Sequence, residues 1–170
     1  MLAAAALLIA LAAPRDGLSP AAGDPFAARC HMGDCVWFAE LRRRIARETP
    51  EGRLLRVELL AGVSSVPAGE DYDRAWGPDA RVDWNPDPLS LWLFCSPRLP
   101  AIIWPGAEGE ATAELLNFPG ASPPNQASSR SVYAHVCHGG AFDAERLGYR
   151  VPPTEELELP RPEAIFARLP

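Results

Sequence analysis

The chain has 170 residues, of which 48% are hydrophobic and 22% charged, and this is enough to bury the core of one globular domain. Its formal net charge of −6 argues against nucleic-acid binding, because such surfaces carry an excess of positive charge. The 19 prolines disfavour long helices, so we expect short strands and long loops rich in proline and glycine.

Residues 1–13, MLAAAALLIALAA, form an uninterrupted apolar run. A transmembrane helix needs about 20 apolar residues, so this run fits the hydrophobic region of a secretory signal better than a membrane span. We predict a signal peptide over 1–22, cleaved after Ala12 or near Ala22, then a flexible leader at 23–29 and one domain at 30–170. No basic residue precedes the run, so the signal is atypical or the true start lies upstream. The processed chain is then expected to be periplasmic or secreted, without a transmembrane anchor.

All four cysteines lie beyond the predicted signal: Cys30, Cys35, Cys95 and Cys137. An even number of cysteines in an exported chain is typical of disulfides, although the sequence alone leaves the pairing open. We favour Cys30 with Cys35, which closes a local loop, and Cys95 with Cys137, which would join two strands. The alternative is a zinc site that adds a histidine, His135 or His138, to Cys30, Cys35 and Cys137.

The segment 36–48 fits both a helix and a strand, because its apolar residues recur every four positions. A turn with proline and glycine follows at 49–53, and the apolar residues of 54–60 then alternate with charged ones. We therefore favour a hairpin over 36–61, with helix, turn and strand as the alternative arrangement.

The remainder of the chain predicts further strands separated by loops. Residues 62–88 are expected to form a long polar loop with one short strand inside it, and 90–95 a central strand that is apolar on both faces. The other expected elements are strands at 101–104 and 131–138, a short apolar piece at 113–118, and a short C-terminal helix at 162–169.

These elements predict a mostly β protein (β-rich α+β). We expect a small antiparallel sheet, barrel- or sandwich-like, with long loops, a short C-terminal helix and two disulfides. No repeat of fixed period is present, which argues against solenoids and propellers.

Three arginines at 42–44 are the chain's one cluster of basic residues. On a strand their side chains alternate between the two faces, so we expect a solvated sheet edge and not one patch for anionic lipid.

The motif HGGAF at 138–142 resembles the oxyanion-hole signature of esterases related to hormone-sensitive lipase. That family also needs a G-x-S-x-G nucleophile motif, which this sequence lacks. We therefore expect the two glycines to end the strand at 131–138, on which His135 and His138 point in opposite directions.

The acidic loop around 70–84 holds the remaining candidates. Trp76 and Trp84 flank a turn there, and exposed tryptophans can stack on sugar rings or fill a pocket of a partner protein. The spacing of the acidic residues does not match a calcium-binding EF-hand loop. We predict no catalytic residue, metal or cofactor, and a binding site drawn from Trp76, Trp84, Asp71, Asp73, His135 and His138.

Two function classes remain. The first is an exported, noncatalytic binding or envelope-associated module whose partner is an envelope protein or glycan. The second is a small periplasmic hydrolase or metal-binding protein. It would draw its functional groups from His135, His138 and the acidic loop, Asp71 and Asp73 included, and these side chains would have to converge on one pocket.

Overall fold

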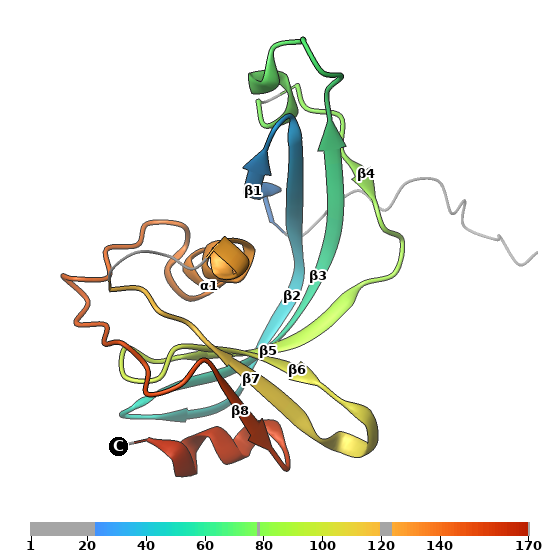
Figure 1. The fold of residues 1–170 in the computed structure, drawn as a ribbon. Coiled ribbons are helices and arrows are strands. Elements are labelled where there is room, and N and C mark those ends of the chain that lie inside the picture. The colour runs from blue at the N-terminus through green and yellow to red at the C-terminus, as the bar shows by residue number, and fades with distance from the viewer. Residues whose placement is uncertain (1–22, 78, 120–123, 170) are drawn as a thin grey trace, which may run out of the picture.

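The computed structural model describes residues 23–77, 79–119 and 124–169 (Figure 1). The predicted signal peptide lies outside these residues. None of the described helices has the length and apolar character needed to cross a membrane.

Eight strands form one antiparallel sheet in the order β1-β2-β3-β5-β6-β7-β8, and β4 pairs with β3 away from this path. The strands are β1 (Phe26–His31), β2 (Asp34–Thr49), β3 (Gly52–Ser65), β4 (Asp83–Trp84), β5 (Leu89–Cys95), β6 (Ala101–Pro105), β7 (Ala111–Leu115) and β8 (Glu156–Leu159). The helices are α1 (Ala127–His138) and the 3-10 turns η1 (Tyr72–Ala75), η2 (Ala107–Gly109), η3 (Pro124–Gln126) and η4 (Pro162–Arg168). The predicted fold class is confirmed.

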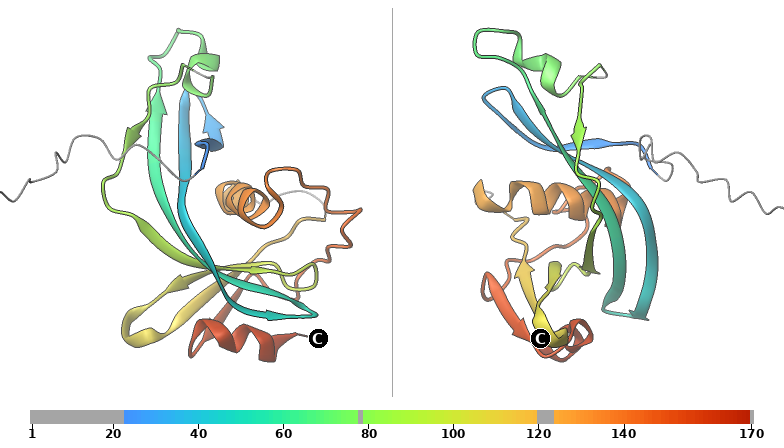
Figure 2. Two further views of the ribbon diagram at one scale, coloured as in Figure 1. Left: turned by 180° about the vertical axis from the view of Figure 1, so that it is seen from behind. Right: turned by 90° about the vertical axis from the view of Figure 1, so that its right-hand side faces the viewer.

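The predicted hairpin over 36–61 is present as β2 and β3, and both strands run beyond the predicted bounds. Two register shifts, between Glu40 and Arg42 and between Ile45 and Arg47, interrupt the β2–β3 ladder. Such bulges bend and twist a sheet, and the hairpin is strongly curved (Figure 2). One end of β3 pairs with β4 and the other with β5, so this hairpin connects the two ends of the molecule.

Strand β5 is central, as its sequence predicts, because both of its faces are covered. Leu91 and Leu93 belong to a core that also contains Val132, Tyr133 and Val136 of α1. Phe94 points to the other face of the sheet, where it joins a second core with Ile165 of η4. Helix α1 lies on the concave side of the bent hairpin, and η4 lies beside β7 and β8 (Figures 1 and 2).

The prediction of a strand at 131–138 is wrong, because these residues belong to α1. The buried residues of this helix are Val132, Tyr133 and Val136. Their spacing of one and three positions fits one face of a helix and does not fit the alternation of a strand. The glycine after His138 therefore ends a helix: Gly139 has φ of 66°, and its N–H donates to the carbonyls of Ala134 and His135.

Two other predicted boundaries shift. Residues 26–29, which the sequence analysis assigns to a flexible leader, are the first residues of β1 and pair with β2. The polar loop predicted from 62 begins only after Ser65. At the C-terminus, η4 begins at Pro162, as the sequence predicts.

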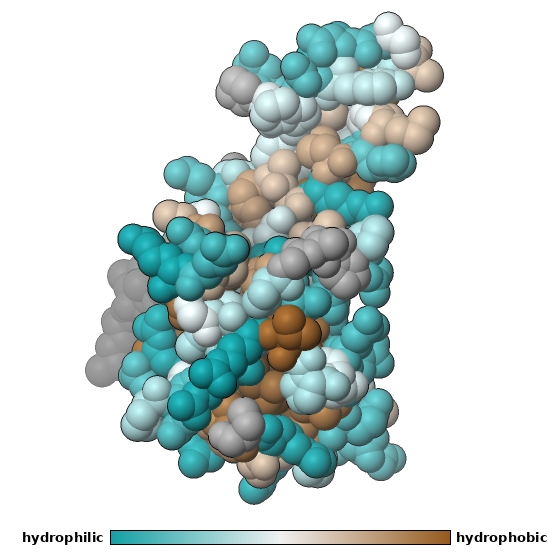
Figure 3. All heavy atoms as spheres, turned by 60° about the vertical axis from the view of Figure 1, so that its left-hand side comes forward, coloured by the Kyte–Doolittle hydropathy of each residue, from teal (hydrophilic) through white to brown (hydrophobic). Residues whose placement is uncertain are grey.

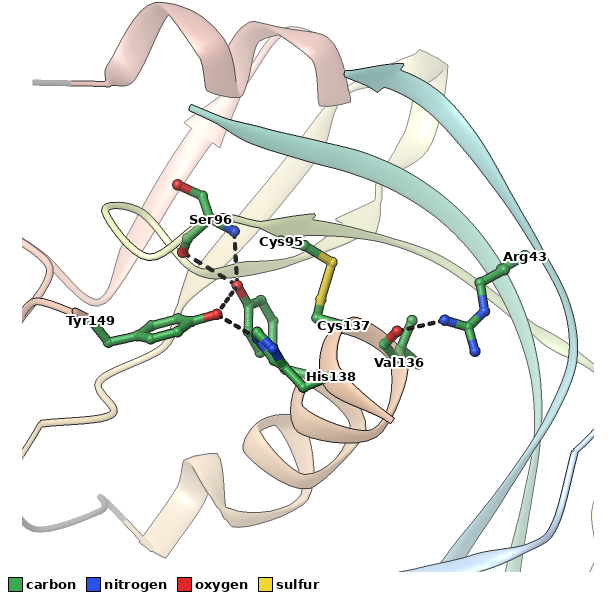
Figure 4. The surroundings of a disulfide bond; sticks show 8 residues. Arg43, Cys95, Ser96, Val136, Cys137, His138 and Tyr149 are labelled. Carbon is green, nitrogen blue, oxygen red and sulfur yellow. Dashed lines mark hydrogen bonds between the residues drawn. A yellow bond between two sulfur atoms is a disulfide. The ribbon is translucent and has the colours of Figure 1, made fainter. Parts of the chain in front are cut away.

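Both predicted disulfides are present. Cys30 and Cys35 are direct partners across β1 and β2, so their bond closes this hairpin. Cys95–Cys137 joins β5 to α1, and not to a second strand (Figure 4). All four cysteines are paired, which excludes the zinc alternative.

The two disulfides close loops of different length, with sequence separations of 5 and 42 residues. Loop-closure entropy then predicts about 2 kcal/mol of stabilisation from Cys30–Cys35 and about 4 kcal/mol from Cys95–Cys137. Urea unfolding of the two double alanine variants tests this order. An equal or larger loss for the Cys30→Ala/Cys35→Ala variant would contradict it.

Candidate functional site

The connection between β3 and β4 encloses a pocket of about 650 Å³ at one end of the molecule. We call it the tip pocket. Figure 3 shows this end as a narrow projection, with hydrophilic residues over most of the visible surface and apolar groups in small separate places. The pocket is lined by Ser64, Ser65, Val66, Asp71, Asp73, Arg74, Ala75, Trp76, Gly77, Asp79 and Arg81. Asp71, Asp73 and Trp76, predicted as binding residues, are therefore brought together here.

A buried hydrogen-bond chain holds the floor of the tip pocket to the sheet. The indole Nε1 of Trp37 donates to Ser64 Oγ at 2.8 Å, and Ser64 Oγ donates to the carbonyl oxygen of Ala75. Ala75 is buried against Cys35 and Trp37 in a small core. The loop is therefore fixed to β2 and β3 beside the Cys30–Cys35 bond, and the pocket floor is pre-formed.

The two tryptophans predicted as a pair have different roles. Trp76 is 54% exposed, and its Nε1 donates to Asp73 Oδ1 at 3.2 Å, which orients the indole ring. Trp84 is half-buried and packs on Gly62, where an added Cβ would lie 2.8 Å from the ring. Trp84 does not line the tip pocket and belongs to the small core beneath it. Of the two rings, only that of Trp76 is available to a ligand in this pocket.

The carboxylates of the tip pocket also shape the loop. Asp71 Oδ1 accepts from the backbone N–H of Asp73 at 3.0 Å and caps η1. Arg74 is paired with Glu70 at 2.7 Å. Arg81 and Asp79 complete a lining in which both signs of charge flank the indole of Trp76. Such a wall can donate hydrogen bonds to a ligand through guanidinium groups and accept them through carboxylates.

The two candidate histidines lie on α1, away from the tip pocket (Figure 1). His135 stacks on Phe26 of β1 with 3.9 Å between the ring centroids. His138 Nε2 is hydrogen-bonded to the hydroxyl of Tyr149 at 2.7 Å. Burial lowers the pKa of both histidines, so both are disposed to be neutral.

His138 is the outer member of a hydrogen-bonded chain beside the Cys95–Cys137 bond (Figure 4). The hydroxyls of Tyr149 and Tyr133 are 3.1 Å apart, and Ser96 N–H donates to the hydroxyl of Tyr133 at 2.9 Å. Burial raises the pKa of Tyr133, and the neighbouring Tyr149 raises it further. No pattern in the sequence predicts this chain, because Ser96 is distant from α1 in sequence and Tyr149 follows it in an irregular loop. Its role is to tie α1 to the loop after β5.

The convergence that a hydrolase or metal site needs is not found in the described part of the chain. Asp71 and Asp73 line the tip pocket, His135 packs on β1, and His138 faces Tyr149. Across residues 23–77, 79–119 and 124–169, no group of three or more histidine, cysteine or acidic side chains could hold a metal ion.

No protein-family model, curated protein or solved structure matches this chain. The function is therefore argued from the geometry of its own residues.

Replacing Tyr133 by phenylalanine removes the acceptor of the fully buried Ser96 N–H. An unpaired buried donor costs about 1–3 kcal/mol, so we expect a loss of stability of that size in urea unfolding. Tyr149→Phe is the matched control, since it leaves the Ser96 contact in place, and its loss should be smaller. Equal losses of stability in the two variants would show that the hydrogen bond from Ser96 to Tyr133 does not cause the loss in Tyr133→Phe.

The lowered pKa of His138 predicts a pH dependence of stability. The unfolded chain, with a histidine pKa of about 6.5, binds the proton more tightly than the folded one. The free energy of unfolding should therefore fall as the pH is lowered through about 6.5 and stop falling below the folded pKa. His138→Gln should reduce this slope and leave the part that His135 contributes, measured by urea unfolding between about pH 7.5 and 5.5. His31→Gln, at an exposed position on β1, is the control. An unchanged slope in His138→Gln would contradict the prediction.

Proposed function

We propose that this protein is an exported, noncatalytic binding module that recognises an envelope glycan in the tip pocket. The observation that carries the proposal is the exposed indole of Trp76 in a pocket of about 650 Å³. This volume lies within the range of about 300–1,000 Å³ that small-ligand sites occupy.

The chemistry of the lining favours a carbohydrate. A sugar ring offers an apolar face to an aromatic side chain and hydroxyl groups at its edge. Trp76 supplies the aromatic face, and the carboxylates and guanidinium groups around it supply acceptors and donors for hydroxyls.

Export is supported by the two disulfides, because such bonds persist in oxidising compartments such as the periplasm and the extracellular space. The apolar run at 1–13 fits the same proposal as a secretory signal. A noncatalytic role is supported by the separation of His135 and His138 from Asp71 and Asp73.

The test is binding of the purified chain to an array of bacterial envelope oligosaccharides, followed by calorimetric titration of any that bind. Trp76→Ala should weaken binding at least ten-fold, because an aromatic anchor in a pocket contributes about 2 kcal/mol or more. Trp76→Phe retains a ring and should keep part of the affinity.

Val151→Ala, an exposed apolar residue outside the tip pocket, is the control and should bind like the natural chain. Oligosaccharide binding that survives Trp76→Ala would refute the tip pocket as the site. Binding to none of the oligosaccharides would refute a glycan ligand.

A further inference from the structure

A second surface gathers arginines on one face of the β2–β3 hairpin. Arg42 lies directly opposite Glu58 in the β2–β3 ladder, and Arg44 lies directly opposite Arg56. Directly opposed residues of two paired strands share a face of the sheet. The run at 42–44 predicts no single patch, because consecutive side chains on a strand alternate between the two faces of the sheet. Arg43 does turn away, and it donates to the carbonyl oxygen of Val136 on α1 at 2.6 Å.

Two aromatic contacts show which face this is. The guanidinium carbon of Arg56 lies 6.0 Å from the ring centroid of Trp92, and that of Arg47 lies 4.5 Å from the ring centroid of Phe166 in η4. Trp92 and Phe166 both pack on the core that η4 covers. Arg42, Arg44, Arg47 and Arg56 therefore share the face of the sheet opposite α1, and we call these four residues the arginine patch.

A pocket of about 310 Å³ lies at this patch, lined by Arg42, Arg43, Arg44, Arg56 and Glu58. Apart from Glu58 its lining residues are all arginines, and of these only Arg43 turns its guanidinium group away, to α1. The hydrogen bond from Arg42 is the main cause that lowers the pKa of Glu58. Desolvation opposes it, and the charges of Arg42, Arg56 and Arg44 lower the pKa further. Three arginines therefore converge on a single carboxylate.

The arginine patch lacks the counter-charges that would neutralise it. Arg42 is paired with Glu58, but among the described residues neither Arg44 nor Arg56 forms an ion pair. Like charges directly opposite each other destabilise a sheet. This like-charge pair stands in a chain whose net charge is −6, so it is not a consequence of a basic composition. An anion bound between the two would relieve the repulsion.

We infer that the arginine patch binds the phosphate groups of an anionic lipid surface. Guanidinium groups bind phosphate through two parallel hydrogen bonds, which favours phosphate chemistry over a simple halide. Arg42, Arg44 and Arg47 extend along about 16 Å of β2, at about 3.3 Å per residue, which is more than one soluble phosphate can span. A lipid surface presents many phosphates at once, and it attracts basic residues through its negative potential.

The experiment is sedimentation of the full chain with vesicles of phosphatidylcholine alone and of phosphatidylcholine mixed with phosphatidylglycerol. The neutral vesicles measure any contribution from the apolar run at 1–13. Arg44→Gln/Arg56→Gln removes the unpaired arginines, and Arg29→Gln/Arg146→Gln removes two exposed arginines outside the patch. Both double variants change the net charge equally.

We expect the natural chain and the Arg29/Arg146 variant to bind the anionic vesicles more tightly than the neutral ones. The Arg44/Arg56 variant should bind the anionic vesicles about 25-fold more weakly, as loss of about five-fold per arginine predicts. Raising the salt from about 0.1 M to 0.5 M should weaken binding of the natural chain. An Arg44→Lys/Arg56→Lys variant should bind more tightly than the glutamine variant and more weakly than the natural chain, since lysine keeps the charge but cannot form the paired hydrogen bonds.

Three results would overturn the inference. They are equal binding to neutral and anionic vesicles, equal losses in the two glutamine variants, and binding of inorganic phosphate in calorimetry without binding to anionic vesicles. Since the tip pocket lies elsewhere on the molecule, failure of this experiment would leave the proposed glycan site standing, and the reverse also holds.

Discussion

The bent hairpin of β2 and β3 is the constraint on which both surfaces depend. At one end it pairs with β1 and β4, and there it carries the loop that encloses the tip pocket. At the other end it pairs with β5, and there its outer face carries the arginine patch. The two bulges in its ladder provide the curvature, which makes room for α1 on the concave side. A straight hairpin would leave α1 without a concave face to pack on.

Helix α1 is held in that concavity by three kinds of contact. Apolar packing is supplied by Val132, Tyr133 and Val136, a covalent bond by Cys137, and hydrogen bonds by the hydroxyl of Tyr133. The apolar contacts have no direction, whereas the disulfide and the hydrogen bonds fix the rotation and position of the helix along β5. The region around α1 is thus suited to a structural role, and the exposed polar chemistry lies at the tip and on the opposite face.

The parts of the fold that the sequence predicted are those with local signals. The hairpin followed from a Pro/Gly turn between two apolar patterns, and β5 followed from a short run that is apolar on both faces. Helix α1 was missed because it is rich in residues that favour strands, and its packing against β1, β5 and β6 overrides that preference. At the site, Asp71, Asp73 and Trp76 were found from composition. Trp84 packs instead on Gly62, which is distant in sequence, and no local pattern predicts this contact.

The order of the strands has a consequence for how the chain reaches this structure. Apart from the step from β3 past β4 to β5, each strand of the main path follows its neighbour in the chain, until α1 intervenes between β7 and β8. Strand pairing of this kind joins mainly neighbours in the chain, so the meander can assemble progressively from its amino-terminal side. Helix α1, which packs on β1, and β8, which pairs with β7 across the helical insertion, join it later.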